Sequence, residues 1–131
     1  MHSAQNLANS LSNISRRLSE LDRHEEALAA IEEALSIYRP LVADRPSVFN
    51  SDLARSLSNL FHILSNLGRM PEALPVIQET ADLLRPLGAE HPAVFAKTFA
   101  SALSRLSHCY SGMGRHEEAL RAQTEVDGLS L

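Results

Sequence analysis

The sequence predicts an all-α fold in which antiparallel helix pairs stack one behind another. A heptapeptide recurs in the 131-residue chain as DRHEEAL at 22–28, GRMPEAL at 68–74 and GRHEEAL at 114–120, with each copy 46 positions after the last. The composition favours helices, because alanine and leucine are abundant while aromatic residues make up only 5% and tryptophan is absent. A repeat of this length is one supersecondary unit that buries its apolar face only by stacking, so the chain predicts an α-solenoid.

The first helix of each unit is expected before the heptapeptide, over 7–21, 53–67 and 99–113. In the middle segment apolar side chains recur at steps of three and four, which places one apolar stripe on a helix. The residues of this stripe in the three units are, in order, Leu7, Leu11, Ile14, Leu18 and Leu21; Leu53, Leu57, Leu60, Phe61, Leu64 and Leu67; and Phe99, Leu103, Leu106 and Tyr110.

A second helical pattern follows each heptapeptide and is separated from the first by a tight turn. Gly68 and Gly114 stand at this turn, where a helix ends most readily on a residue that tolerates positive φ. Pro40 and Pro86 are predicted to end the second helix, because proline cannot donate the next hydrogen bond. Prolines also follow at the start of the next unit, where proline is favoured in a first helical turn: Pro46 and Pro92.

These signals divide one domain, 1–131, into three repeats at 1–45, 46–91 and 92–131. The last helix loses its apolar face, since Gln123, Asp127 and Ser130 stand where the first unit has Ile31, Leu35 and Tyr38. A polar outer face is typical of a terminal repeat. The first unit lacks the proline-flanked connection that precedes the first helix in the other units, so we interpret the chain as the tail of a longer array. We expect the N-terminal face, which no preceding repeat covers, to promote self-association.

The repeated residues resemble the tetratricopeptide repeat (TPR) family, and the resemblance covers essentially the whole chain. In the second unit Gly68 matches the turn residue, Ala73 the small residue that lets the helices approach, and Ile77 the bulky one a turn later. The period of 46 exceeds the roughly 34 of the ordinary repeat, and Phe61 replaces the usual small residue in the first helix. The sequence is therefore most similar to the long-unit variety of kinesin light chains and of arrays attached to signalling ATPases. The resemblance implies a right-handed superhelix of three stacked antiparallel helix pairs.

The resemblance also implies that the first helices line a concave groove that binds a peptide or a partner domain. In related arrays, asparagines at equivalent positions of successive repeats form hydrogen bonds to the backbone of an extended peptide. Asn13 and Asn59 occupy equivalent positions here, 46 residues apart. The alternative is a solvated helix face without a ligand. Serines occupy the positions of the lysines that clamp a carboxylate in part of the family, which argues against binding of chaperone tails. The candidate groove residues are Asn9, Ser12, Asn13, Arg16, Arg55, Ser58, Asn59, His62, Ser101, Ser104, Arg105 and His108.

Charge indicates that the partner has acidic character. The second helices are mostly acidic, whereas the first helices are mostly basic, and a basic inner surface steers an acidic segment inwards in a salt-dependent way. The charged residues of the first helices are Arg16, Arg17, Arg55, Lys97 and Arg105 against Glu20 and Asp52.

Other function classes find little support in the sequence. The net charge of −4 argues against nucleic-acid binding, no stretch approaches the roughly 18 apolar residues of a membrane span, and the first residues lack the plan of a secretory signal. A single cysteine is compatible with a reducing compartment, so we expect a cytoplasmic protein.

Neither a cofactor nor a metal site nor catalysis is expected. His62 and His108 share one phase, but facing helices lie roughly 8–10 Å apart, too far for two imidazoles to share a zinc ion without rearrangement. Cys109 lies beside the apolar stripe and is interpreted as a packing residue. The sequence thus predicts a non-catalytic scaffold that binds a protein or peptide in its groove. The alternative is a structural element that makes end-to-end contacts between repeats.

Overall fold

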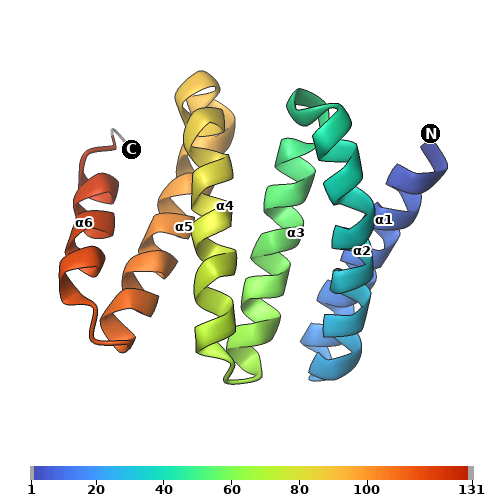
Figure 1. Cartoon of the computed structure of the whole chain (residues 1–131), viewed down its shortest axis with the longest axis horizontal. Coiled ribbons are helices and arrows are strands. Elements are labelled where there is room, and N and C mark those ends of the chain that lie inside the picture. Colours follow the sequence, from blue (N-terminus) through green and yellow to red (C-terminus); the bar gives the residue numbers. More distant parts are fainter. Residues whose placement is uncertain (1, 130–131) are drawn as a thin grey trace.

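The computed structural model describes residues 2–129, which form six helices joined by short turns. The helices are α1 (His2–Glu20), α2 (His24–Asp44), α3 (Pro46–Asn66), α4 (Met70–Glu90), α5 (Pro92–Gly112) and α6 (His116–Asp127). Each helix packs against the next along the chain, and the pairs stand side by side in a row from α1 and α2 at one end to α6 at the other (Figure 1). The predicted all-α solenoid of stacked helix pairs is confirmed. None of the described helices combines the length and hydropathy needed to cross a lipid bilayer.

The turn within each pair explains why the heptapeptide recurs. Its first residue, Asp22, Gly68 or Gly114, has positive φ of 60°, 73° and 75° respectively. The next residue is an arginine whose amide donates to a carbonyl near the end of the preceding helix, which closes a Schellman motif. The arginine side chain then binds the glutamate three positions on with both of its donors, in the pairs Arg23–Glu26, Arg69–Glu72 and Arg115–Glu118. The repeat thus encodes a helix end, a turn and a helix start in one segment.

Asp22 is the residue of this turn that carries a side chain at positive φ, a conformation disfavoured for any residue with a Cβ. We expect Asp22→Gly to raise the free energy of unfolding by about 0.5 kcal/mol, because the relief of strain exceeds the added chain entropy of glycine. Chemical denaturation measures this change. Gly68→Ala is the matched control and should destabilise the protein by about 1 kcal/mol. Equal stability of Asp22→Gly and the parent would contradict the assignment of strain.

The prediction that Pro40 and Pro86 end the second helices is wrong. Both prolines lie inside helices, which continue to Asp44 and Glu90. Both rings are exposed, and the carbonyls that lose their donors belong to Ser36 and Asp82, which are themselves exposed to water. The missing hydrogen bond therefore falls on the solvent side of the helix. The apolar residues beyond each proline, such as Leu41 and Leu87, still pack against the core and hold the last turn in place.

One hydrophobic core runs through all the helix pairs. Its most deeply buried large side chains include Tyr38, Leu57, Ile77 and Leu103. Ala73, the small residue expected to let two helices approach, is fully buried. Continuous packing between pairs gives a rigid support on which the first helices α1, α3 and α5 present their outer residues.

Phe61 and Cys109, two unusual residues of the first helices, belong to this core. Phe61, the large residue at a usually small position, is buried. Cys109 is also buried, and burial raises the pKa of its thiol, which disfavours the reactive thiolate. Cys109 is therefore placed as a packing residue of the core rather than as a nucleophile.

Candidate functional site

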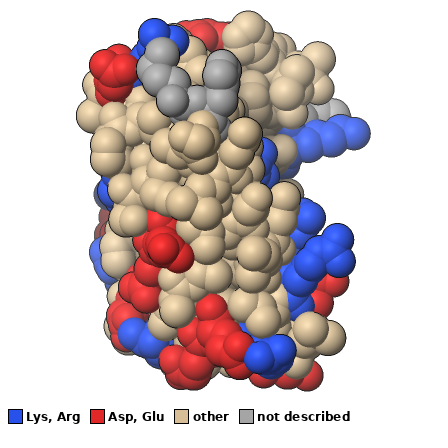
Figure 2. Space-filling model, turned by 90° about the vertical axis from the view of Figure 1, so that its right-hand side faces the viewer, with Lys and Arg blue, Asp and Glu red and all other residues tan. Residues whose placement is uncertain are grey.

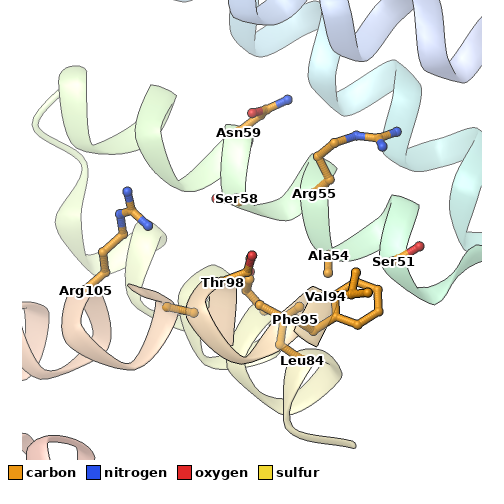
Figure 3. Close-up of a pocket in the computed structure, with 12 residues that line it drawn as sticks. Ser51, Ala54, Arg55, Ser58, Asn59, Leu84, Val94, Phe95, Thr98 and Arg105 are labelled. Atoms are coloured by element: carbon orange, nitrogen blue, oxygen red, sulfur yellow. The ribbon is translucent and has the colours of Figure 1, made fainter. Parts of the chain in front are cut away.

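A pocket of about 380 Å³ lies between α3 and α5, with α4 at its base. Its apolar floor comes from all of these helices, and the Phe95 and Val94 side chains lie together there (Figure 3). Polar and basic groups surround the floor. The lining residues are Ser51, Ala54, Arg55, Ser58 and Asn59 of α3, Thr80 and Leu84 of α4, and Val94, Phe95, Thr98, Ala102 and Arg105 of α5.

Two arginines flank this floor from different helices. Both side chains line the pocket, and Figure 3 shows Arg55 above the apolar residues and Arg105 to their left. Arg55 donates to Asp52 at 3.0 Å, which neutralises part of its charge. Arg105 makes no ion pair with any residue that the structure describes. The pocket therefore combines an apolar base with a net positive rim.

Two further hollows adjoin this pocket through shared residues. One, of about 450 Å³, lies between α1 and α3 and shares Ser58 and Asn59 with the pocket. The other, of about 410 Å³, lies between α3 and α5 and shares Arg105. Its wall includes Ser65, whose hydroxyl is buried without a hydrogen-bond partner among the described residues. The three hollows share lining residues and follow one another along the first helices.

Several predicted groove residues meet in these hollows. Arg55, Ser58, Asn59 and Arg105 line the pocket, and Arg16 lines the hollow beside α1. The remaining hollow is lined by a set that includes His62, Ser104 and His108.

Other predicted residues are placed differently. Ser12 is only 2% exposed, so its expected place on the groove surface is wrong. Its hydroxyl accepts a hydrogen bond from the Asn59 amide at 3.1 Å and holds α3 against α1. The Asn9 side chain is half-buried and accepts a hydrogen bond from the Tyr38 hydroxyl. Asn13 and Ser101 are exposed but line none of these hollows.

The pKa of Tyr38 is raised, first by burial and then by the nearby Asp52 carboxylate. The hydroxyl is therefore a permanent hydrogen-bond donor to Asn9 at physiological pH. This contact fixes Asn9 and leaves its carbonyl oxygen less available to a ligand.

The apolar floor is the part of the site that sequence reasoning missed. Val94 and Phe95 follow Pro92 in the first turn of α5. Phe95 lies four residues before Phe99 and extends the apolar stripe by one turn, whereas Val94 is off that stripe. The available signal was the extension of the stripe from Phe99 back to Phe95, with a second apolar residue, Val94, beside it. Their meeting with Ala54 and Leu84 depends on how three helices pack, which the one-helix pattern does not contain.

A serine, a histidine and an aspartate meet at the turn after α1. The Ser19 hydroxyl lies 3.5 Å from His24 Nδ1, and His24 Nε2 lies 3.6 Å from Asp22. Both distances are long for hydrogen bonds, and the Asp22 side chain is 93% exposed. A catalytic triad needs a short, desolvated chain of hydrogen bonds, so this trio lacks the geometry to activate the hydroxyl.

His62 and His108 line the same hollow but have no carboxylate or thiol beside them there. Within residues 2–129, no group of three metal-ligating side chains comes together. The polar groups of the hollows are amides, hydroxyls, imidazoles and guanidinium groups, together with the Glu20 carboxylate in the hollow between α1 and α3. The amides and hydroxyls suit hydrogen bonding to a backbone, and the guanidinium groups suit ion pairing with carboxylates.

Family models and solved structures resemble this chain. Two models, each described as "Tetratricopeptide repeat", match residues 7–42 and 100–130. No curated protein matches. The TPR domain of Arabidopsis FLU superimposes with a TM-score of 0.73 at 14% identity, over 94% of this chain and 93% of that chain.

Two crystal structures of the Podosopora anserina putative kinesin light chain with nearly identical TPR-like repeats are also similar. The first has a TM-score of 0.70 at 20% identity, covering 96% of this chain and 55% of that chain. The second has a TM-score of 0.69 at 20% identity, covering 96% of this chain and 56% of that chain. This chain therefore spans little more than half the length of those proteins. At such identities the likeness shows a shared fold.

Proposed function

Because the chain belongs to the tetratricopeptide repeat family, whose members generally bind proteins or peptides, we propose that it is a non-catalytic module that holds an acidic peptide segment in its groove. The observation that supports this proposal best is the pocket between α3 and α5, which combines an apolar floor with the arginines Arg55 and Arg105. The segment would place a bulky apolar side chain on the floor and carboxylates on both sides of it. Its backbone would pair with Ser58 and Asn59.

Shape and charge both support this ligand class. A pocket of about 380 Å³ accepts a large side chain, and burial of such a side chain contributes about 1.5–3 kcal/mol. Guanidinium groups bind carboxylates with two donors each, which fixes the position of the chain as well as adding affinity. A neutral or basic peptide would gain the free energy of burying its apolar side chain without the ion pairs to the two arginines.

The test is the affinity for a synthetic fluorescent peptide in which aspartates flank a central leucine. We expect Arg55→Ala combined with Arg105→Ala to weaken binding about tenfold, measured by fluorescence anisotropy. Binding by the parent should also fall between about 0.1 M and 1 M salt, because the screening length drops from about 10 Å to about 3 Å.

The matched control is Arg121→Ala, which removes an exposed arginine of α6 that lines none of the groove hollows. It should bind the peptide as the parent does. Equal binding by the Arg55 and Arg105 double variant, with an unchanged helical signal, would overturn the proposal.

His62 makes binding depend on pH. Partial desolvation, and then the charge of Arg105, lower the pKa of His62 below its ordinary 6.5, so the free protein holds a neutral imidazole at pH 7. A bound carboxylate favours the charged form and raises this pKa, so affinity should increase as the pH falls from about 7 to about 5. The peptide aspartates stay ionised in this window because their ordinary pKa is about 3.9.

Isothermal titration at several pH values measures this dependence. We expect His62→Gln to remove most of the increase and His116→Gln, at the exposed start of α6, to retain it. A pH profile that His62→Gln leaves unchanged would assign the dependence to another group.

A further inference from the structure

The outer face of α1 carries large apolar side chains in water. Leu7 is 52% exposed and Ile14 47% exposed, and Leu21 lies exposed further along the same stripe. Figure 2 looks onto this end of the molecule and shows a broad area of uncharged residues interrupted by an acidic group, with basic groups along the right-hand edge and groups of both signs at the lower end. The exposed leucines and isoleucine lie on this face among uncharged polar residues, and exposed apolar side chains that gather on one face are typical of contact sites.

The other helix pairs show what covers this face. Leu53 and Phe99 are in phase with Leu7, and they are only 3% and 4% exposed. Leu106 is in phase with Ile14 and is 8% exposed. In both pairs the first helix packs against the second helix of the preceding pair, α3 on α2 and α5 on α4. Leu60, the α3 residue in phase with Ile14, is partly buried, and Met113, in phase with Leu21, is 41% exposed. A preceding second helix therefore buries the Leu7 position in both pairs and covers the Ile14 position fully in one pair and partly in the other.

A ladder of ion pairs accompanies these contacts. Arg39 of α2 binds Glu79 of α4 at 2.9 Å and 3.1 Å, and Arg85 of α4 binds Glu125 of α6 at 2.8 Å and 3.1 Å. Each arginine stands 40 residues before its glutamate. Glu33 of α2 has the phase of these glutamates, yet among residues 2–129 no basic side chain pairs with it.

We propose that the face of α1 and α2 docks a further helix pair of the same repeat type, whose second helix carries an arginine that binds Glu33. The apolar stripe matches the apolar face of such a helix, and Glu33 supplies the next position of the ladder. This contact uses a different surface from the groove and extends beyond peptide binding.

A second copy of this chain fits the face less well. Its C-terminal helix α6 has Gln123 and Asp127 in the phase of Ile31 and Leu35, which are buried in α2. The sequence has Leu131 in the phase of Arg39. Stacking of copies end to end would therefore place polar groups on the apolar stripe and leave Glu33 without an arginine.

The test uses the whole chain and a synthetic peptide with the sequence of residues 24–45, which contains the apolar face of α2 and Arg39. We expect fluorescence anisotropy to show binding that Leu7→Glu combined with Ile14→Glu weakens more than about tenfold. The matched control, Leu120→Glu, changes a similarly exposed leucine of α6 and should leave binding unchanged.

Glu33 is tested by a double-mutant cycle. A peptide with Arg39→Ala should bind the parent chain about two- to fivefold more weakly, as expected for an exposed ion pair, and Glu33→Gln should bind both peptides equally. These measurements remain informative if Leu7→Glu combined with Ile14→Glu perturbs folding.

Three outcomes would overturn the proposal: no binding of the peptide at millimolar concentration, equal binding by all variants, or a dimer of the parent chain that Leu7→Glu dissociates. The last outcome would show that a second copy occupies the face. Arg55→Ala and Arg105→Ala should not affect any of these measurements, so failure of the groove proposal is distinguishable from failure of this one.

Discussion

Leu57→Ala is expected to lower the free energy of unfolding by about 3 kcal/mol, because it removes a fully buried side chain and leaves a cavity. Leu57 lies in α3, which packs against α2 on one side and α4 on the other, so neighbouring helices cannot easily close the space. The loss should lower the unfolding midpoint by about 10 °C, measured by thermal denaturation followed by circular dichroism.

Leu11→Ala is the informative control for this change, because Leu11 has the same phase in α1. Leu11 is only partly buried, since no helix precedes α1 in the structure. We expect Leu11→Ala to lower the free energy of unfolding clearly less than Leu57→Ala does. Equal losses at both positions would contradict the view that burial depends on a preceding helix pair.

Charge reversal of the groove rim should have the largest effect on ligand binding. We expect Arg55→Glu combined with Arg105→Glu to weaken the aspartate-flanked peptide about 100-fold, because two attractive contacts become repulsive. Both residues lie at the edge of the pocket rather than in the core, so the fold should persist. Anisotropy titrations give the affinity, and circular dichroism checks the helical content.

A peptide with lysines in place of the aspartates is the decisive partner for this variant. It should bind the charge-reversed protein better than the parent, since the signs of rim and ligand then match again. If the reversed protein loses the acidic peptide without gaining the basic one, the arginines act on the fold rather than on the ligand.

Local features of the fold follow well from the sequence. The turn residues Gly68 and Gly114 have the predicted positive φ, and Pro46 and Pro92 start helices as expected. These features depend on neighbours in the chain, for which residue type is a sufficient guide. The prediction for the prolines at 40 and 86 fails because their effect depends on whether the lost hydrogen bond faces water, which is a tertiary property.

The sequence predicts the candidate site less well than it predicts the local features of the fold. The position of Arg55 and Arg105 opposite the apolar stripe predicts that they face the groove, and both line the pocket. The same pattern assigns Ser12 to the groove, yet the approach of α3 to α1 buries it. A helical pattern gives the direction of a side chain around its own axis, but not the distance to the next helix.

The sequence by itself determined the helix pairs, their turns and the need to stack, because periodicity and turn chemistry act within one repeat. The tertiary structure alone decided where the stack forms a pocket and where it leaves an apolar face open. The floor beneath Arg55 and Arg105 combines side chains from three helices, and the apolar face at Leu7 is open because no helix of the described chain covers it. Both properties arise from contacts between repeats, where identical local patterns meet different neighbours.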